Sequence, residues 1–258
     1  MSADGHRAEI AAAAELLRHS RSALFITGAG VSADSGLPTY RGIGGLYDGQ
    51  ATEEGIAIEA ALSGEMLAER PEITWKYLVQ IGRATWGKTY NRAHEVIVLI
   101  EQRLPRVWTL TQNIDGFHRR AGSKNLIEIH GNMSRVYCPR CEHEETAEEY
   151  REIPIPPRCP ECQGVLRPDV VLFGETLPED KLLTLYGELQ EGFDVVLSVG
   201  TSSVFPYIVQ PVVLARRAGK PTVEINPGQT SISDLVDVRI PLGAAAALDA
   251  IWRKLEEE

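Results

Sequence analysis

The stretch SALFITGAGVSA, residues 22–33, decides the fold. It begins with a short apolar run of the kind that forms a buried strand. It continues with Gly28, Gly30 and Ala33 in the spacing G-x-G-x-x-A. Glycines directly after a strand let backbone N–H groups approach a pyrophosphate at the start of the next helix. The stretch therefore indicates a dinucleotide site on an α/β fold.

A hydride-transfer enzyme would place a second strand after this pattern, ending in an acidic residue about 20 residues further on. Glu53 and Glu54 stand at that distance, but they lie in GQATEEGIAI, which does not have the pattern of a strand. We therefore predict a dinucleotide site that is built differently from that of a dehydrogenase.

Apolar runs like the one at 22–27 recur along the chain, and helical patterns such as 92–104 and 177–190 lie between several of them. Apolar strands that alternate with helices are typical of a parallel, doubly wound α/β sheet. The further predicted strands are 106–111, 125–129, 169–175, 194–199 and 221–225.

Small or polar residues follow five of these strands directly. A single cluster of this kind is explained by turn chemistry. In an open parallel sheet, however, the ligand crevice lies outside the carboxyl ends of the strands, so five clusters predict one shared crevice. The clusters are GAG (28–30), QNID (112–115), HG (130–131), GTSS (200–203) and NPG (226–228).

All four cysteines lie in one short segment with the spacing C-x2-C-x17-C-x2-C: Cys138, Cys141, Cys159 and Cys162. Two such turns present four thiolates to one point, which is the arrangement of a structural zinc site. Disulfides or free thiols are the alternative, and a cytoplasmic setting disfavours disulfides. Four thiolates leave no open coordination position, so the nearby His130 is not needed as a ligand.

The cysteine segment interrupts the alternation of strands and helices, which sets the predicted domain boundaries. We predict a zinc-binding module over 133–167, inserted into a catalytic domain that spans 1–132 and 168–258. A helical insert, about 43–90, belongs to the catalytic domain.

The chain has 258 residues and a formal net charge of -10. Such a surface repels phosphate backbones, so we expect no nucleic-acid partner. No apolar run reaches the roughly 18 residues of a membrane span, and the N-terminal helix pattern lacks the apolar core of a signal peptide. We expect a cytoplasmic protein without a membrane partner.

Several longer motifs occur in a fixed order around the cysteines: GAGVSADSGLPTYRG, TQNIDGFHRRAG, EIHGN, RPDVVLFGE, GTSS and EINP. Together they resemble the sirtuins, which are NAD-dependent protein lysine deacylases. The resemblance covers roughly residues 24–255. It implies a Rossmann-like domain with an inserted small zinc domain, NAD as cosubstrate, one structural zinc ion, and acyl-lysine peptides or proteins as substrates.

By this resemblance His130 is the catalytic base. It activates a ribose hydroxyl after the acyl oxygen has displaced nicotinamide, and the products are free lysine and O-acyl-ADP-ribose. An imidazole suits this step because its pKa lies near working pH. Asn113 is expected to order water at the reacting centre. From the residues alone, a histidine packed beside the zinc module is the alternative, and His118 is expected on a helix surface.

The resemblance also assigns binding residues. In the loop that covers NAD, Tyr40 replaces the more usual Phe. The peptide is expected to complete a short sheet between two edges, Val171 to Glu175 and Val204 to Tyr207. The predicted peptide contacts are Val171, Phe173, Gly174, Glu175 and Val204. The predicted NAD contacts are Gly28, Ala29, Gly30, Asp34, Tyr40, Arg41, Gln112, Asn113, Ile114, Asp115, Gly200, Thr201, Ser202, Asn226, Pro227, Gly228 and Ala244.

Desuccinylating sirtuins carry a Y-x-x-R pair in the helix after the first insert. Here Tyr77 is followed three residues later by Gln80, although Arg83 stays open because this insert aligns poorly. We therefore predict an apolar pocket for acetyl or longer uncharged acyl groups. Two other functions remain: an NAD-dependent mono-ADP-ribosyltransferase on the same scaffold, and a non-catalytic NAD or ADP-ribose sensor.

Overall fold

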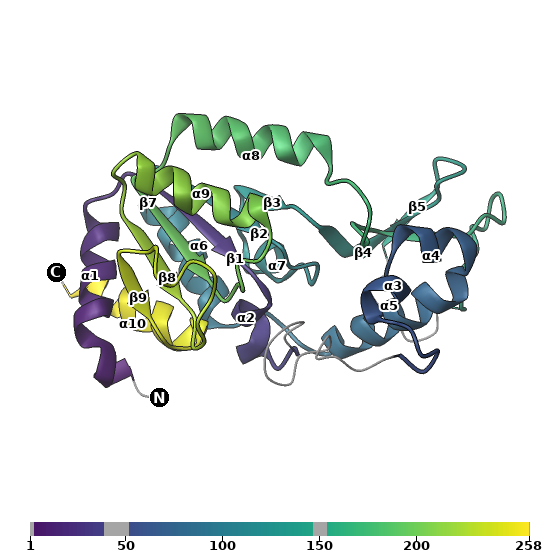
Figure 1. The fold of residues 1–258 in the computed structure, drawn as a ribbon, viewed down its shortest axis with the longest axis horizontal. Helices are drawn as coiled ribbons and strands as arrows, with labels where there is room; N and C mark the ends of the chain where they lie inside the picture. The colour runs from purple at the N-terminus through teal and green to yellow at the C-terminus, as the bar shows by residue number, and fades with distance from the viewer. Residues whose placement is uncertain (1–2, 39–51, 147–153, 258) are drawn as a thin grey trace.

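The computed structural model describes residues 3–38, 52–146 and 154–257. Its centre is a six-stranded parallel sheet with the order β3-β2-β1-β7-β8-β9 (Figure 1). The chain builds outward from β1 to β3 and then returns to place β7 on the other side of β1. In sheets of this type the ligand crevice lies at such a reversal. The strands are β1 (Ser22–Thr27), β2 (Arg106–Thr111), β3 (Leu126–Glu128), β7 (Val195–Val199), β8 (Thr222–Ile225) and β9 (Val238–Ile240).

Helices cover both faces of this sheet, which explains why β1 is apolar throughout and not alternating. Successive side chains of a strand point to opposite faces. Phe25 therefore joins the core beneath α1 (Arg7–Arg18), α6 (Arg92–Arg103) and α10 (Ala244–Glu256). Ile26 joins the core beneath α8 (Glu179–Glu191) and α9 (Pro206–Arg217), which lie together on the other face in Figure 1.

A second, smaller unit lies beside the sheet, at the right of Figure 1. Its three-stranded antiparallel sheet has the order β5-β4-β6. One apolar core joins this sheet to three helices from the region of the predicted helical insert. Trp75 ties the two parts together, because its Nε1–H donates to the Leu166 carbonyl at 2.8 Å. The elements are α3 (Ile58–Ala61), α4 (Gly64–Glu69), α5 (Pro71–Thr85), β4 (Gly131–Tyr137), β5 (Glu144–Thr146) and β6 (Arg167–Val170).

The prediction of an α/β doubly wound fold with an inserted small domain is confirmed, but one strand assignment was wrong and one strand was missed. The predicted strand 169–175 does not join the parallel sheet. Its first residues belong to β6, which pairs antiparallel with β4. The sixth parallel strand is instead β9, whose three residues, VRI, give too short and too mixed a pattern to stand out in the sequence.

Short helices complete the chain: α2 (Ala29–Ser32) and α7 (Phe117–Ala121), with 3-10 turns at Ala3–His6 and Ala33–Ser35. No helix in the described part of the chain has the length and apolar composition needed to cross a membrane.

Candidate active site

The loops after β1 and β7 meet at the reversal of the sheet. The Gly30 N–H donates to the Gly200 carbonyl at 2.8 Å, and the Gly28 N–H donates to the Val199 carbonyl at 3.2 Å. A Cβ on Gly30 would lie 2.7 Å from the Gly200 Cα, so only glycine permits this approach. The glycines of the G-x-G-x-x-A pattern thus serve loop-to-loop packing, and two of the amides predicted to meet phosphate are engaged within the protein.

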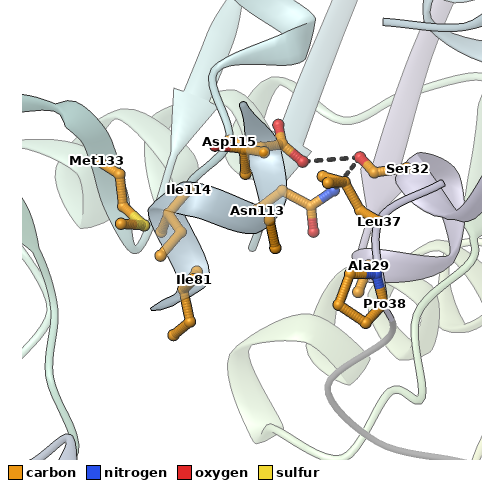
Figure 2. Close-up of a pocket in the computed structure, with 11 residues that line it drawn as sticks. Ala29, Ser32, Leu37, Pro38, Ile81, Asn113, Ile114, Asp115 and Met133 are labelled. Carbon is orange, nitrogen blue, oxygen red and sulfur yellow. Dashed lines mark hydrogen bonds between the residues drawn. The ribbon is translucent and has the colours of Figure 1, made fainter. Parts of the chain in front are cut away.

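A buried polar network follows β2, and Ser32 organises it (Figure 2). The Asn113 side-chain amide donates to the Gly28 carbonyl at 3.0 Å and to the Ser32 Oγ at 3.2 Å. The Ser32 hydroxyl in turn donates to Asp115 Oδ2 at 2.7 Å. Burial raises the pKa of Asp115, and hydrogen bonds from Phe117 N–H and Ser32 lower it in part. The network therefore holds a rigid amide beside a carboxyl group that binds its proton more tightly than usual.

This network forms one wall of a small cavity of about 20 Å³, which has room for about one water molecule. Figure 2 shows apolar side chains around it, with Ser32, Asn113 and Asp115 as the labelled polar residues. A mostly apolar lining with a few fixed polar groups is typical of small-molecule sites. The lining residues are Ala29, Ser32, Leu37, Pro38, Ile81, Ala84, Thr85, Asn113, Ile114, Asp115 and Met133.

His130 lies between β3 and β4, where its ring contacts the backbone of Gln112. Its Nδ1 lies 3.0 Å from the Gln112 carbonyl oxygen, which can only accept, so Nδ1 carries the proton of the neutral ring. The lone pair is then at Nε2, 2.6 Å from the Tyr207 hydroxyl. Burial lowers the pKa of His130, although the bond to Gln112 offsets part of this shift. The ring is therefore neutral at neutral pH and can accept a proton at Nε2.

Gly131 gives the chain its sharp turn directly after His130. Its φ is +85°, and a Cβ there would lie 1.9 Å from the Asp169 carbonyl oxygen. Any side chain at this position would push β4 and β6 apart. The position of His130 at the edge of the crevice therefore depends on a glycine at 131.

Other residues of the predicted NAD site come from distant parts of the chain. Thr201 accepts from Gln112 Nε2 at 2.7 Å through its hydroxyl and from Asn226 Nδ2 at 3.0 Å through its carbonyl. Asp34 accepts from the Ala245 N–H at 3.0 Å, beside Ala244 at the start of α10. The structure thus joins the ends of β1, β2, β7 and β8 at one place. Tyr40 and Arg41 lie outside the described residues.

The predicted peptide edge has fewer unpaired backbone groups than the sequence suggested. The Phe173 N–H donates to the Leu62 carbonyl at 3.0 Å, and the Phe173 carbonyl accepts from the Gly64 N–H at 3.1 Å. The Glu175 carboxylate is held by Arg167 at 2.8 and 2.9 Å. Phe173 is therefore paired with the helical insert through its backbone, and Glu175 stabilises the loop.

The two sides of the predicted peptide groove differ in their exposure. On the opposite edge Val204 is 56% exposed. Near Glu175, Gly174 has open space around its Cα, with no atom within 4 Å of the place a Cβ would take. These two residues are the parts of the predicted contact set that lie open to a partner.

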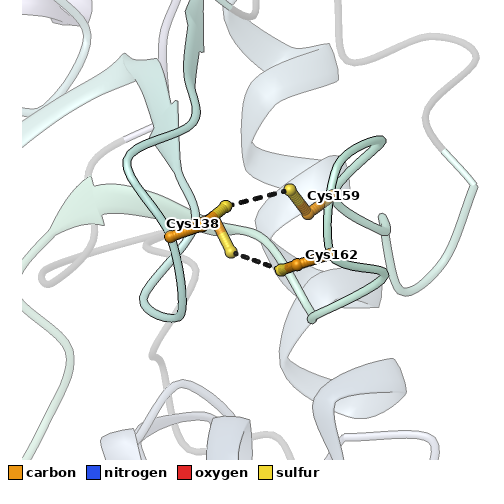
Figure 3. A group of neighbouring side chains, drawn as sticks. Cys138, Cys159 and Cys162 are labelled. Atoms are coloured by element: carbon orange, nitrogen blue, oxygen red, sulfur yellow. Dashed lines mark hydrogen bonds between the residues drawn. The ribbon is translucent and has the colours of Figure 1, made fainter.

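The four cysteine side chains converge between the two turns that carry them (Figure 3). Their sulfur atoms all lie within 4.8 Å of one another, and the four are free thiols. The Cys138–Cys162 and Cys141–Cys159 sulfur distances are 3.4 and 3.5 Å. Bonds of about 2.3 Å in a tetrahedral zinc site imply sulfur pairs about 3.8 Å apart, so the four sulfur atoms fit zinc.

Comparison with known proteins decides the family. The profile of the Sir2 family matches residues 28–206.

The chain belongs to the Sir2 family. It is 54% identical over 240 residues to the NAD-dependent protein deacylase 2 of Pseudomonas aeruginosa, with 92% of this chain and 93% of the relative covered. A solved Sir2 homologue–NAD complex superimposes with a TM-score of 0.84 at 32% identity, covering 95% and 93% of the two chains. A solved Sir2 complex with a deacetylated p53 peptide and 3'-O-acetyl-ADP-ribose has a TM-score of 0.84 at 28% identity and covers 98% of each chain.

The predicted membership of the Sir2 family is therefore confirmed, but one histidine was placed wrongly. His118 is not on a helix surface: it is 2% exposed, and its Nε2 lies 2.9 Å from the Thr27 hydroxyl. The short helix α7 packs its first residues against α6, where His118 meets His94 with ring centroids 4.7 Å apart. A helix of five residues is too short for its buried face to be read from periodicity.

Two residues of this Sir2-family site were not singled out from the sequence. Ser32 links Asn113 to Asp115 and lies inside the motif GAGVSA, where its spacing gave no signal. Tyr207 contacts His130 from α9. It lies in the segment that was assigned to the peptide edge, and no local pattern relates it to a histidine 77 residues away.

Proposed function

We propose that this protein is an NAD-dependent protein lysine deacylase that transfers an acyl group from lysine to ADP-ribose and releases nicotinamide. The observation that carries the proposal is the neutral His130 at the sheet's carboxyl edge, with its lone pair on Nε2. Family membership supports it, because the relative from Pseudomonas aeruginosa is named an NAD-dependent protein deacylase.

His130 acts as the base, and the protein prepares it in two ways. The Gln112 carbonyl fixes the ring in the tautomer that leaves Nε2 able to take a proton from a ribose hydroxyl. Burial lowers the pKa, so the ring is already neutral at neutral pH and need not lose a proton first. A general base of this kind typically contributes about 100- to 10,000-fold in rate.

Asn113 and Asp115 hold the nicotinamide end of the cosubstrate. The Asn113 amide is fixed by two hydrogen bonds, so its carbonyl oxygen has a defined direction into the cavity. Asp115, with its raised pKa, supplies a carboxyl group that either accepts a hydrogen bond or, once protonated, donates one. Together with Ile114 they suit the amide and the flat ring of nicotinamide.

The rest of the cosubstrate follows the carboxyl ends of the strands. The phosphates lie against the loops of Ala29 and Gly200 to Ser202, since the Gly28 and Gly30 amides are engaged elsewhere. The adenosine end lies along Asn226 to Gly228 and reaches Ala244 at the start of α10.

The zinc ion is structural. Cys138, Cys141, Cys159 and Cys162 supply all four ligands of a tetrahedron, so no position remains for a substrate or a water molecule. The four cysteines would hold the ion between the turns of the small antiparallel sheet, and β4 of that sheet begins directly after His130. Zinc therefore acts on catalysis only by stabilising the fold around the base.

The acyl pocket is proposed to be apolar. The Tyr77 hydroxyl, which would have to bind an acidic acyl tail, donates to Glu54 instead. Hydrogen bonds from Lys76 first, and then from Tyr77, lower the pKa of Glu54 to about 2, so this partner is a carboxylate. Gln80 and Arg83 are exposed on α5. An acidic tail near Tyr77 would thus meet a second negative charge.

We also propose that the enzyme acts on proteins in the cytoplasm and not on nucleic acid or at a membrane. The net charge of -10 supports the absence of a nucleic-acid partner.

The test is an assay of the purified protein with NAD and a panel of acyl-lysine peptides, followed by mass spectrometry. The proposal predicts free lysine peptide, nicotinamide and O-acyl-ADP-ribose in equal amounts. A peptide that keeps its acyl group and gains ADP-ribose would identify an ADP-ribosyltransferase instead. Tight NAD binding with no product of either kind would identify a sensor.

A further inference from the structure

The lone pair of the catalytic base is covered by a side chain of the protein itself. The Tyr207 hydroxyl lies 2.6 Å from His130 Nε2. Because His130 Nδ1–H already donates to the Gln112 carbonyl, Nε2 can only accept, and the Tyr207 O–H is the donor. The nitrogen that must take a proton from the cosubstrate is therefore already hydrogen-bonded.

An aromatic pair holds this hydroxyl in place. The Phe205 and Tyr207 rings stack with centroids 5.5 Å apart and planes 15° from parallel. Both rings meet His130 edge to face, each with centroids 6.0 Å apart. Removing only the Tyr207 hydroxyl leaves all three ring contacts, so its hydrogen bond can be tested apart from packing.

The segment that carries Tyr207 is also shaped by local constraints. Ser203 has a φ of +53°, a left-handed conformation that is unfavourable for a residue with a side chain. It is held there by hydrogen bonds from its N–H to the Thr201 hydroxyl and from the Ser231 hydroxyl to its carbonyl. Val204, on the predicted peptide edge, comes next. The cap on the base and the peptide edge thus belong to one short segment.

We propose that Tyr207 is a positioning residue that caps His130 until the cosubstrate is bound. The cap holds the ring with Nε2 directed into the crevice, and a ribose hydroxyl of NAD must displace the tyrosine hydroxyl to reach the same lone pair. This inference rests on the proposed function, since it takes the ribose of NAD as the group that approaches His130.

Competition for one lone pair has a measurable consequence. A hydrogen bond typically has a net worth of about 2- to 10-fold in an equilibrium constant. Tyr207→Phe removes the competing donor and keeps the ring, so NAD should bind about 2- to 10-fold more tightly. In a His130→Ala background there is no lone pair to compete for, and the same substitution should change the Kd by less than about 2-fold.

The experiment is a double-mutant cycle of NAD dissociation constants, measured by calorimetry on the full chain without peptide. Tyr186→Phe is the matched control, because Tyr186 lies exposed on α8, and this change should leave the Kd as it is. Deacylation by Tyr207→Phe is measured in parallel, so that an effect on kcat can be separated from an effect on the Kd for NAD.

Three results would overturn the cap: an unchanged or weaker affinity for NAD in Tyr207→Phe, an equal change in both His130 backgrounds, or a large fall in kcat at unchanged Kd. The last result would place the hydroxyl in the chemical step itself. The proposed function fails separately. If the variants show the predicted coupling but the wild-type protein forms no deacylated product, the cap stands and the assignment as a deacylase is removed.

Discussion

His130 and Cys138 are eight residues apart, one just before β4 and the other just after it, yet their surroundings differ in what they leave open. Cys138 lies with three other cysteines, and the four sulfur atoms together supply all the ligands of a tetrahedral site. His130 has one nitrogen fixed by a backbone carbonyl and the other bonded, within the described part of the chain, to a hydroxyl that a ligand can replace. Clustered ionisable side chains alone therefore do not identify a reactive site; an exchangeable position does.

The two regions also differ in how they are held. The crevice depends on close backbone approach, as between Gly30 and Gly200, and on hydrogen bonds between strand ends. In its described residues the zinc module has little helix or strand: β5 has three residues, and β6, which begins at the end of the module, has four. We therefore expect substitutions in the crevice to lower activity, and substitutions in the zinc module to lower the stability of the fold.

Removal of zinc should give the largest effect. Metal binding and folding are linked at such sites, so Cys159→Ala or a strong chelator should lower the melting temperature by on the order of 10 °C and abolish deacylation. Metal analysis together with thermal unfolding measures both effects.

His143→Ala is the control for this prediction, because His143 lies beside the cluster but pairs with Glu145 and Glu161. It should keep one zinc ion per chain. A protein that contains no zinc and still unfolds at the same temperature would contradict a structural metal.

Gly131 offers a test of the junction between the two regions. Gly131→Ala should destabilise the protein by about 3–5 kcal/mol, because it adds a collision with the Asp169 carbonyl to a left-handed backbone. Gly174→Ala has a similar φ, +82°, but open space, and should cost about 1–2 kcal/mol. Equal losses in denaturant unfolding would mean that the approach of β4 to β6 does not constrain residue 131.

Much of this arrangement could be predicted from the sequence, because it is local. The loops of Gly28 to Gly30 and Gly200 to Ser202 follow apolar strands, and parallel strands bring their carboxyl ends together. The cysteine spacing predicted the grouping of the four thiols. The fold class followed from the same regular alternation.

What the sequence did not reveal depends on contacts between distant segments. The helical insert and the zinc module share one core through Trp75 and Leu166, although they are far apart in the sequence and were predicted as separate inserts. Pairing of Phe173 with Leu62 and Gly64 used up backbone groups that looked available for a peptide. Neither contact leaves a periodic trace, since each is decided by packing between segments that are not neighbours in the chain.

The next largest expected effect is the preference of the enzyme between acyl groups. An unpaired carboxylate in an apolar pocket is unfavourable by several kcal/mol, and Tyr77 is already bonded to the ionised Glu54. Even a partial penalty should make acetyl-lysine better than succinyl-lysine by about tenfold or more in kcat/KM. The comparison uses one peptide with acetyl, butyryl or succinyl lysine. If kcat/KM for the succinyl peptide equals or exceeds that for the acetyl peptide, the prediction of an apolar pocket is wrong. Arg83 is then the residue to test, with Arg83→Ala as the next variant.

The smallest expected effect concerns His94, which is buried and, unlike His130, has no path to substrate. Burial lowers the pKa of His94 to about 4, below the value of about 6.5 for an unfolded chain. Between these values the unfolded state binds more protons, so stability is full above about pH 6.5 and is lost as pH falls toward 4. His94 should contribute about 1 kcal/mol of this loss between pH 7.5 and 5.5.

His94→Gln tests this contribution. Glutamine keeps an acceptor for the Asn91 N–H in the capping box of α6 and removes the titration. Unfolding in denaturant at pH 7.5 and 5.5 should show a smaller pH effect in the variant. An identical pH effect in both proteins would show that His94 does not titrate in this range.

The most direct test of the account measures two partial reactions of His130→Ala on the same acetyl-lysine peptide. One is the exchange of labelled nicotinamide into NAD, which precedes the action of the base; the other is formation of free lysine. The account predicts exchange within about tenfold of wild type and deacylation lowered by about 100- to 10,000-fold. Near-normal deacylation, or an equal loss of both reactions with NAD still bound, would contradict the role of His130 as the base.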